Sequence, residues 1–233
     1  MNAKPWAVVP LQTGSAAQLL ADGMARYERL GPDDSPTLRW YRSVAPAIVL
    51  GRGQGGVVLE SGPDPVTTRF TGGGAVWMTP DMLCLDVLIP NGHPWFTDRL
   101  TDVFDLVGQR WAQALRQMGV DDVVVYDGPT TARRRGTDRE RLLAAICYAT
   151  RGRGEVLWRE RKLVGLAQRR RRHGLMVQCG MLRRWEPEPL LRYLGADATA
   201  PDILNAAVGL DEVLTQPPDD EQVMRAVTAA FRT

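Results

Sequence analysis

The amino-acid sequence predicts an α+β fold in which helices flank a mixed β-sheet, and three observations lead to this prediction. Helical and extended segments follow one another without the strict strand–helix–strand alternation of a doubly wound sheet. Residues 155–182 contain three extended segments separated by short turns, a pattern typical of an antiparallel meander. Residues 83–89 form a mostly apolar run that is typical of a central strand.

The first part of the chain predicts one helix followed by short strands. Apolar residues recur at helical spacing over residues 13–30, and a loop rich in Gly, Pro and Asp at residues 31–36 ends this helix. Turn-forming residues separate the extended segments that follow. We expect strands at residues 38–41, 47–50, 66–70 and 75–78.

The clearest helix of the sequence comes before the meander. An apolar stripe that includes Leu100 and Trp111 runs from residue 97 or 98 to Met118. Gly119 follows the stripe and ends the helix, as glycine commonly does at helix C-termini.

The remaining elements are shorter. After a strand at residues 123–126, the polar, arginine-rich residues 127–141 predict a loop, which is either a solvated excursion or a segment that closes over a ligand. The last helix is expected to be capped by Asp219 or Asp220. The meander strands are placed at residues 155–158, 162–168 and 175–182, and a short helix at residues 187–194.

Size and composition favour one soluble domain. The 233 residues are 44% hydrophobic, which supports a substantial core, and no apolar run reaches the roughly 18 residues that cross a bilayer. The net charge of +2 does not imply binding of bulk nucleic acid. The three cysteines lack the spacing of a disulfide framework or a zinc site, and we expect a reducing cytoplasm.

Lysine is scarce, which makes Lys162 a candidate functional residue. Lysine and arginine total 29, yet only Lys4 and Lys162 are lysines. Arginine cannot replace a compact, rotatable ammonium group. The alternative is that Lys162 is a surface lysine retained by chance.

The chain is organised around the segment Arg69–Val76, which contains three consecutive glycines followed by an apolar run. Glycine allows positive φ and close approach to a ligand, and successive bare N–H groups form an anion-binding nest. Arg69 adds hydrogen-bond donors suited to phosphate or carboxylate. The alternative is a bulged turn that needs its glycines only for shape.

Three motifs occur in an informative order. They are Leu38–Gln54, the turn Arg69-Phe70-Thr71-Gly72-Gly73-Gly74-Ala75-Val76, and the segment Arg161-Lys162-Leu163-Val164-Gly165-Leu166-Ala167-Gln168. The sequence resembles the lipoate–protein ligase and octanoyltransferase family over roughly residues 15–230. This resemblance implies the fold of biotin–protein ligases and class II aminoacyl-tRNA synthetases, with a smaller second sheet. It also implies one catalytic domain over residues 1–233, without a separate C-terminal accessory domain.

The resemblance implies an ATP-dependent ligase. Such an enzyme activates lipoate or octanoate as an acyl-adenylate, with Mg²⁺ on the phosphates, and transfers the acyl group to a lysine of an acidic lipoyl domain or H-protein. Lys162 matches the family's lysine and would stabilise charge on the reacting group. An apolar tunnel must hold the acyl chain. The matching substrate and ATP contacts are Arg69, Thr71, Gly72, Gly73, Gly74, Ala75, Gly165 and Ala167.

Cys147 opens a second mechanism. In one branch of the family, a cysteine followed by an aromatic residue lies some fifteen residues before the lysine and carries the acyl group as a thioester. Cys147 is followed by Tyr148 and lies fifteen residues before Lys162. A thiolate there could take octanoate from acyl carrier protein without ATP. The alternative is a buried structural cysteine.

Two departures from the family pattern open a third possibility. After the glycine turn the family often has an aromatic residue followed by His-Asp, but here Trp77 is followed by Met78-Thr79, and Cys179 stands where a histidine is frequent. The protein could therefore be a non-catalytic relative that binds an acyl group or a carrier.

Other sites are not indicated. His93 and His173 are too few and too far apart in sequence for a metal site, and no Ser-His-Asp order is evident. Cys84 lies in an apolar strand and is expected in the core. The run Arg169–Arg172 predicts either a solvated hairpin face or a docking surface for an acidic carrier domain.

Overall fold

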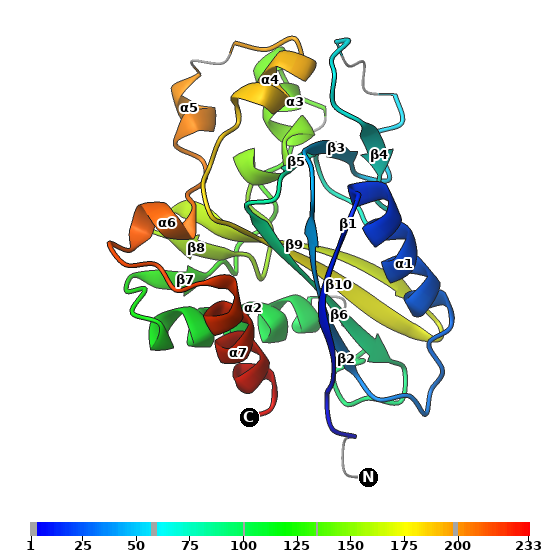
Figure 1. Ribbon diagram of the computed structural model, residues 1–233. Helices are drawn as coiled ribbons and strands as arrows, with labels where there is room; N and C mark the ends of the chain where they lie inside the picture. Colours follow the sequence, from blue (N-terminus) through cyan, green and yellow to red (C-terminus); the bar gives the residue numbers. More distant parts are fainter. Residues whose placement is uncertain (1–3, 57–59, 100, 134, 198–199) are drawn as a thin grey trace.

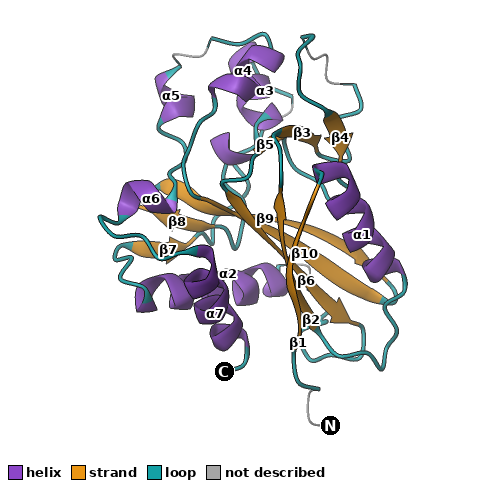
Figure 2. Cartoon of the chain, viewed as in Figure 1, coloured by secondary structure: helices purple, strands orange, loops and turns teal. Residues whose placement is uncertain are grey.

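A seven-stranded mixed sheet forms the centre of the molecule in the computed structural model (Figures 1 and 2), which describes residues 4–56, 60–99, 101–133, 135–197 and 200–233. The strand order is β1-β2-β6-β10-β9-β8-β7. β1 and β2 are parallel, whereas the other neighbours are antiparallel, so the predicted mixed sheet is confirmed. The strands are β1 (Ala7–Gly14), β2 (Thr37–Ser43), β6 (Met82–Pro90), β7 (Val123–Val125), β8 (Val156–Trp158), β9 (Arg161–Arg171) and β10 (Gly174–Leu182).

A smaller sheet and short helices form the opposite end of the molecule from the two termini (Figure 1). Its strand order is β4-β3-β5, with β3 parallel to β4 and antiparallel to β5. The predicted second sheet is thus confirmed. The elements of this end are β3 (Ala47–Leu50), β4 (Val66–Thr68), β5 (Val76–Met78), α3 (Asp138–Ala145), α4 (Glu188–Tyr193) and α5 (Pro201–Leu204).

Helices cover both faces of the large sheet. α2 (Asp102–Gln117) and α7 (Asp220–Phe231) pack on one face, and α1 (Ala16–Glu28) packs on the other (Figure 2). Every residue of β6 is buried, as expected of a strand covered on both faces. A short helix α6 (Leu210–Val213) precedes α7. Among the described residues, no helix has the length and apolar character needed to cross a membrane.

A buried ion pair lies under α1. Arg39 on β2 and Asp86 on β6 are fully buried, and their Nη1 and Oδ2 atoms are 2.7 Å apart. Gly23 of α1 makes room for the pair, since a Cβ there would lie 2.6 Å from the Asp86 carboxylate. Gln178 on β10 donates from Nε2 to the Asp86 Oδ1 atom at 3.2 Å. This network links β2, β6 and β10 on the face of the sheet next to the glycine turn.

The chain differs from the sequence-based prediction at several element boundaries. β1 was missed because its residues alternate weakly between exposed and half-buried positions. The helix expected from residue 97 or 98 begins at Asp102, and Leu100 lies outside the described residues. The loop predicted over residues 127–141 was wrong at its end, since α3 begins at Asp138. A capping box between Thr137 and Glu140 starts this helix.

Candidate active site

The glycine turn connects β4 to β5 and is held by Arg69. The Arg69 guanidinium donates to the carbonyl oxygens of Gly72 at 2.8 Å, Gly74 at 2.7 Å and Val49 at 3.3 Å. Gly73 has a φ of +96°, which an L side chain rarely adopts. The hydrogen bonds therefore give Arg69 a positioning role, and its predicted contact with an anionic ligand stays a prediction.

Thr71 ties the turn to the large sheet. Its hydroxyl donates to the Gln178 Oε1 atom at 2.7 Å, and Gln178 in turn contacts Asp86. Thr71 is buried, so these bonds are shielded from water. The role of Thr71 visible in the structure is to anchor the turn on the ion pair of Arg39 and Asp86.

The turn also positions Cys147. Ala75 N donates to the carbonyl oxygen of Ala145 at 2.6 Å, and Cys147 N donates to the carbonyl oxygen of Ala75 at 2.9 Å. Cys147 begins the 3₁₀ helix Cys147–Ala149 directly after α3. A Cβ added to Gly74 would lie 2.6 Å from Cys147 N. The bare backbone of Gly74 therefore permits the close packing of these two segments.

This packing predicts that two neighbouring glycine substitutions differ in their effect on the stability of the protein. Gly74→Ala should lower the free energy of unfolding by about 1–3 kcal/mol, because its methyl group meets backbone atoms of residues 145–147 that cannot move independently. Gly72→Ala is the matched control, since a Cβ there has no atom within 4 Å. Urea unfolding of both variants measures the difference, and equal stabilities would contradict the packing argument.

Lys162 lies on β9 as a fully enclosed ammonium, with 1% of the residue exposed. Its Nζ atom is 2.6 Å from Glu155 Oε2 and donates to the Cys147 carbonyl oxygen at 2.7 Å. The Tyr148 ring centroid lies 5.6 Å from the same atom. The structure thus brings together the two residues that the sequence singled out, Lys162 and Cys147.

Glu155 is the site residue that sequence reasoning missed. It precedes β8, is buried, and accepts hydrogen bonds from Gly152 N at 2.6 Å and Leu166 N at 3.4 Å. Burial raises the pKa of Glu155, and Lys162 opposes this shift. The sequence offered one signal for Glu155. It is an acidic residue at the start of a predicted apolar strand, and the next strand along the chain contains the scarce lysine.

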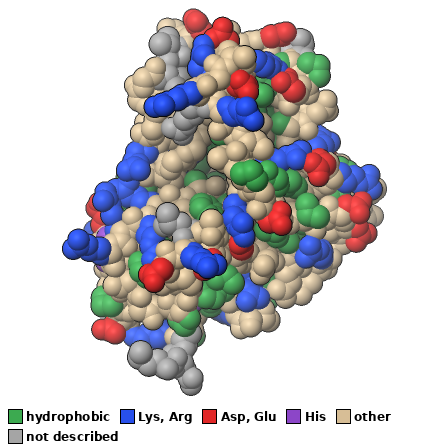
Figure 3. Space-filling view, turned by 180° about the vertical axis from the view of Figure 1, so that it is seen from behind, with side chains coloured by type: hydrophobic (Ala, Val, Ile, Leu, Met, Phe, Trp, Pro, Cys, Tyr) green, Lys and Arg blue, Asp and Glu red, His purple; other side chains and the backbone are tan. Residues whose placement is uncertain are grey.

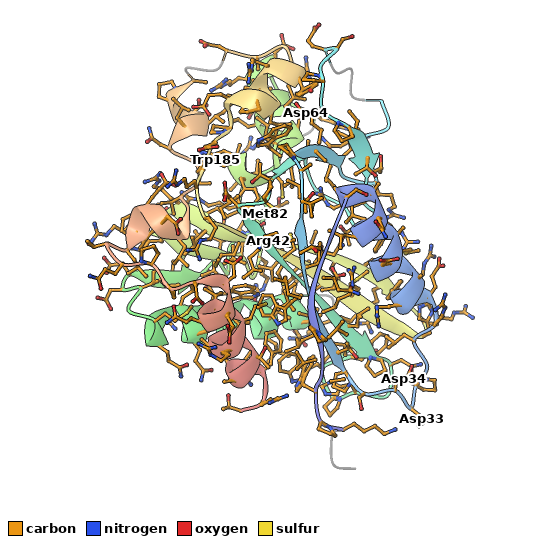
Figure 4. All side chains as sticks on the ribbon, viewed as in Figure 1. Asp33, Asp34, Arg42, Asp64, Met82 and Trp185 are labelled. Carbon is orange, nitrogen blue, oxygen red and sulfur yellow. The ribbon has the colours of Figure 1, made fainter. Side chains whose placement is uncertain are left out.

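Two cavities share Cys147 in their walls. A chamber of about 260 Å³ with polar and apolar walls lies beside the glycine turn, and it is lined by Gly72–Gly74, Glu155, Lys162 and Gln168 among others. A narrow slot of about 50 Å³ lies toward α1 and has mostly apolar walls, which include Leu20, Val49, Met78 and Met82. Met82 is labelled near the middle of the molecule in Figure 4. Cys147, Leu166 and Ala167 line both cavities, so they form the junction.

Small residues shape the slot around Tyr148. The Tyr148 hydroxyl donates to the Gly180 carbonyl oxygen at 2.6 Å. A Cβ at Gly165 would lie 3.3 Å from the Tyr148 ring, so Gly165 leaves space for it. The predicted contacts Gly165 and Ala167 therefore both lie along the slot wall.

The three cysteines differ in environment. Cys84 and Cys179 are buried, and burial raises the pKa of each thiol, which suppresses the thiolate. Cys84 is in the core as predicted. Cys147 is half-buried and lies at the cavity junction. Of the three thiols, Cys147 is therefore the least buried.

The donor set of the chamber does not fit a Mg²⁺–nucleotide. Mg²⁺ is usually held by one or two carboxylates together with phosphate oxygens. The carboxylate among the described residues that line the chamber is Glu155, which is committed to Lys162. The described part of the chain contains no group of three or more His, Cys, Asp or Glu side chains arranged to hold a metal ion.

Comparison with known proteins identifies the family. Residues 21–232 match the family model of the lipoyl protein ligase A/B catalytic domain. Octanoyltransferase LipM from Kyrpidia tusciae is 25% identical over 242 aligned positions, which cover 97% of this chain and 85% of that protein.

Solved structures share the fold. Lipoate-protein ligase A bound with ATP has a TM-score of 0.74 at 17% identity, covering 99% of this chain and 84% of that one. A bi-partite lipoate protein ligase from Thermoplasma acidophilum, described together with its E2 lipoyl domain, has a TM-score of 0.73 at 19% identity, covering 99% and 83%. Because the family model matches most of its length, this chain belongs to the family of lipoyl protein ligase A/B catalytic domains.

Proposed function

We propose that the protein is an acyltransferase that carries an octanoyl group as a thioester on Cys147. The observation that supports this most strongly is the position of Cys147, which lines both the apolar slot and the chamber beside the glycine turn. The similarity to an octanoyltransferase over 97% of the chain agrees with it. Acyl carrier protein is the proposed donor, and a lysine of a lipoyl domain or H-protein is the proposed acceptor.

Two displacements complete the reaction. The Cys147 thiolate attacks the carbonyl carbon of the donor thioester, the new C–S bond forms, and the donor thiolate leaves and takes up a proton. The acceptor amine then attacks the same carbonyl carbon, the C–N bond forms, and the Cys147 thiolate leaves. The amine loses one proton in this second step.

The residues around Cys147 have distinct proposed roles. The slot would hold the acyl chain, with about 0.8 kcal/mol of stabilisation per buried CH₂. Lys162 would stabilise the negative charge that develops on the carbonyl oxygen. Glu155 would keep the ammonium in place, since it pairs with Nζ at 2.6 Å. Glu155 and Lys162 thus act as a unit beside the thiol.

ATP-dependent ligation of lipoate or octanoate, predicted first from the sequence, is the second candidate. The bare backbone of the glycine turn, which lines the chamber, favours it. The commitment of Glu155 to Lys162 counts against it, because carboxylates usually help to hold the Mg²⁺ of a bound nucleotide.

One experiment separates the candidates. The protein is incubated with octanoyl-acyl carrier protein in the absence of ATP and Mg²⁺, and intact-mass spectrometry follows the enzyme and an added lipoyl domain. We expect an octanoyl adduct that maps to the Cys147 peptide, followed by octanoylation of the lipoyl domain. Modification of the lipoyl domain only after addition of ATP, Mg²⁺ and free acid would favour the ligase. Binding without transfer under both conditions would favour a non-catalytic relative.

We also propose that the protein acts in the cytoplasm.

A further inference from the structure

The apolar slot runs across four neighbouring strands of the large sheet. Gly165 on β9 pairs with Gly180 on β10. Gly180 pairs on its other side with Cys84 on β6, which pairs in turn with Tyr41 on β2. Directly paired residues point to the same face of a sheet, and all four residues line the slot. This row gives the slot a direction, from β9 toward β2, and its side chains grow in size along the way.

The slot begins at β9 beside the half-buried thiol. Ala167 of β9 lines both cavities together with Cys147. Tyr148 packs over the two glycines of the row, since an added Cβ would lie 3.3 Å from it at Gly165 and 2.9 Å from it at Gly180. Its hydroxyl is also bonded to the Gly180 carbonyl oxygen. The first half of the slot is therefore bounded by a ring that is held in place.

Tyr41 closes the far end of the slot. β1 is the next strand after β2, and none of its residues, all of which the structure describes, lines the slot. Tyr41 is buried, and the Arg39 Cζ atom lies 4.8 Å from its ring centroid. Arg39 is itself held in the buried ion pair with Asp86. A chain that passed Cys84 would press on a ring backed by buried charges, whose separation is costly.

The side walls are more adaptable than the end. Met82, which lies two residues from Cys84 on β6, and Met78 on β5 both line the slot. Methionine side chains have three rotatable bonds and fill irregular spaces. The slot is narrow, at about 50 Å³, so an acyl chain would enter by moving these side chains aside. The width of the slot can therefore adapt, whereas its length is set by Cys84 and Tyr41.

The spacing of the strands gives this length. Neighbouring strands lie about 4.8 Å apart, so along the row Cys84 is about 10 Å and Tyr41 about 14 Å from β9. An extended octanoyl chain has seven carbon–carbon bonds of about 1.5 Å each, and their zigzag spans roughly 9 Å. The methyl end of an octanoyl group would therefore meet Cys84, whereas a dodecanoyl group would reach Tyr41.

The outer surface offers less to a saturated chain. Figure 3 shows basic and acidic side chains scattered over the back of the molecule. An apolar chain gains most where it leaves water completely. The buried slot is therefore the better place for the acyl group.

We propose that Cys84 is a specificity-determining residue that limits the acyl group to about eight carbons, with Tyr41 as the wall behind it. This inference rests on the proposed function, in which the slot holds the acyl chain. The Cys84 thiol forms no covalent bond with the substrate. A buried cysteine behaves as a small hydrophobic residue, and here it provides an apolar stop for the terminal methyl group. The size of the side chain at this position then decides which chain length fits.

The test varies the acyl length together with the side chain on β6. Acylation of Cys147 by the hexanoyl, octanoyl, decanoyl and dodecanoyl thioesters of N-acetylcysteamine is followed by intact-mass spectrometry. Cys84→Ala enlarges the end of the slot, and Cys84→Val narrows it. Cys179→Ala is the matched control, because this buried thiol belongs to the core on the opposite face of the sheet, with Trp111. Thermal unfolding checks that each variant is folded.

The two Cys84 variants should shift the length preference in opposite directions. In Cys84→Ala, the kcat/KM for decanoyl relative to octanoyl should rise by about 3–10-fold, because the removed sulfur leaves room for part of the longer chain. In Cys84→Val, the kcat/KM for hexanoyl relative to octanoyl should rise by a similar factor, and Cys179→Ala should keep the wild-type preference. The same preference in all four proteins, or shifts in one direction in both Cys84 variants, would overturn the inference.

Binding of the free acids separates failure of this inference from failure of the proposed function. Calorimetry of hexanoate, octanoate, decanoate and dodecanoate with the Cys147→Ala protein measures the fit to the slot without any reaction at the thiol. A shift of the tightest-binding acid after the additional change Cys84→Ala or Cys84→Val supports the length limit even when no acyl adduct forms on Cys147. An unchanged length dependence refutes it, whatever the result of the acylation assay. Absence of both binding and acylation refutes it as well.

Discussion

Replacing Cys147 by alanine is expected to lower the rate of octanoyl transfer by at least about a thousand-fold while the protein remains folded. Cys147 lines both cavities, and the change removes the one group proposed to form a covalent bond with the acyl chain. The backbone hydrogen bond from Cys147 N to the Ala75 carbonyl oxygen persists in alanine, so the glycine turn keeps its attachment. The defect should therefore appear in the chemistry rather than in stability.

Single-turnover assays with octanoyl-acyl carrier protein measure this effect, and thermal unfolding provides the control for folding. In the wild type, peptide mapping should find the acyl group on Cys147 and not on Cys84 or Cys179, because burial raises the pKa of those two thiols. A Cys147→Ala protein that transfers octanoate at an undiminished rate would eliminate the thioester mechanism. Transfer that also requires ATP would identify the ligase instead.

The elements that could be predicted from sequence are those whose signal is local. The helix over residues 13–30 has clear periodicity and is present as α1 with shorter ends, and the apolar strand over residues 47–50 is present with the predicted bounds. β1 has no such signal, since its pattern of exposure does not separate an apolar face from a polar one. α3 begins within an arginine-rich segment whose charge suggests a loop, and only its capping box indicates a helix.

The candidate site was predictable where residue type alone is informative. The scarcity of lysine pointed to Lys162, and the family resemblance pointed to Cys147; the structure joins them through a hydrogen bond from Nζ to the Cys147 carbonyl oxygen. Glu155 was not predictable as a functional residue in this way. Its significance depends on burial and on its pairing with Lys162, which arise only when the chain folds.

The same limit of prediction from sequence applies to Arg69, although its residue type did suggest a function. A guanidinium beside three glycines predicts an anion site, yet folding turns the loop carbonyls toward it. The hydrogen bonds within the turn therefore compete with a ligand for the same N–H groups. Sequence identifies such donors but does not say whether the protein uses them itself.

Because Glu155 and Lys162 form a buried ion pair, we expect that substitutions at these positions can separate the stability of the protein from its activity. Lys162→Met should lower the free energy of unfolding by about 3–5 kcal/mol, because it leaves the Glu155 carboxylate buried without its cation. Transfer should also fall by about 10²–10³-fold. In the double variant Glu155→Gln/Lys162→Met, most of the stability should return, since no buried charge remains, whereas transfer should stay low.

The pH dependence of Lys162→Met tests the cause of its instability. Without Lys162, burial raises the pKa of Glu155 further above its usual value of 4.5. The folded state then binds more protons than the unfolded state at intermediate pH, so the free energy of unfolding decreases as pH rises through that window. Urea unfolding between about pH 5 and 8 should show this decrease most steeply in Lys162→Met, less in the wild type, where the ammonium opposes the shift, and least in the double variant. Parallel pH profiles in the three proteins would mean that the unpaired Glu155 carboxylate does not cause the instability of Lys162→Met. The explanation of that instability by a buried, unpaired charge would then be wrong.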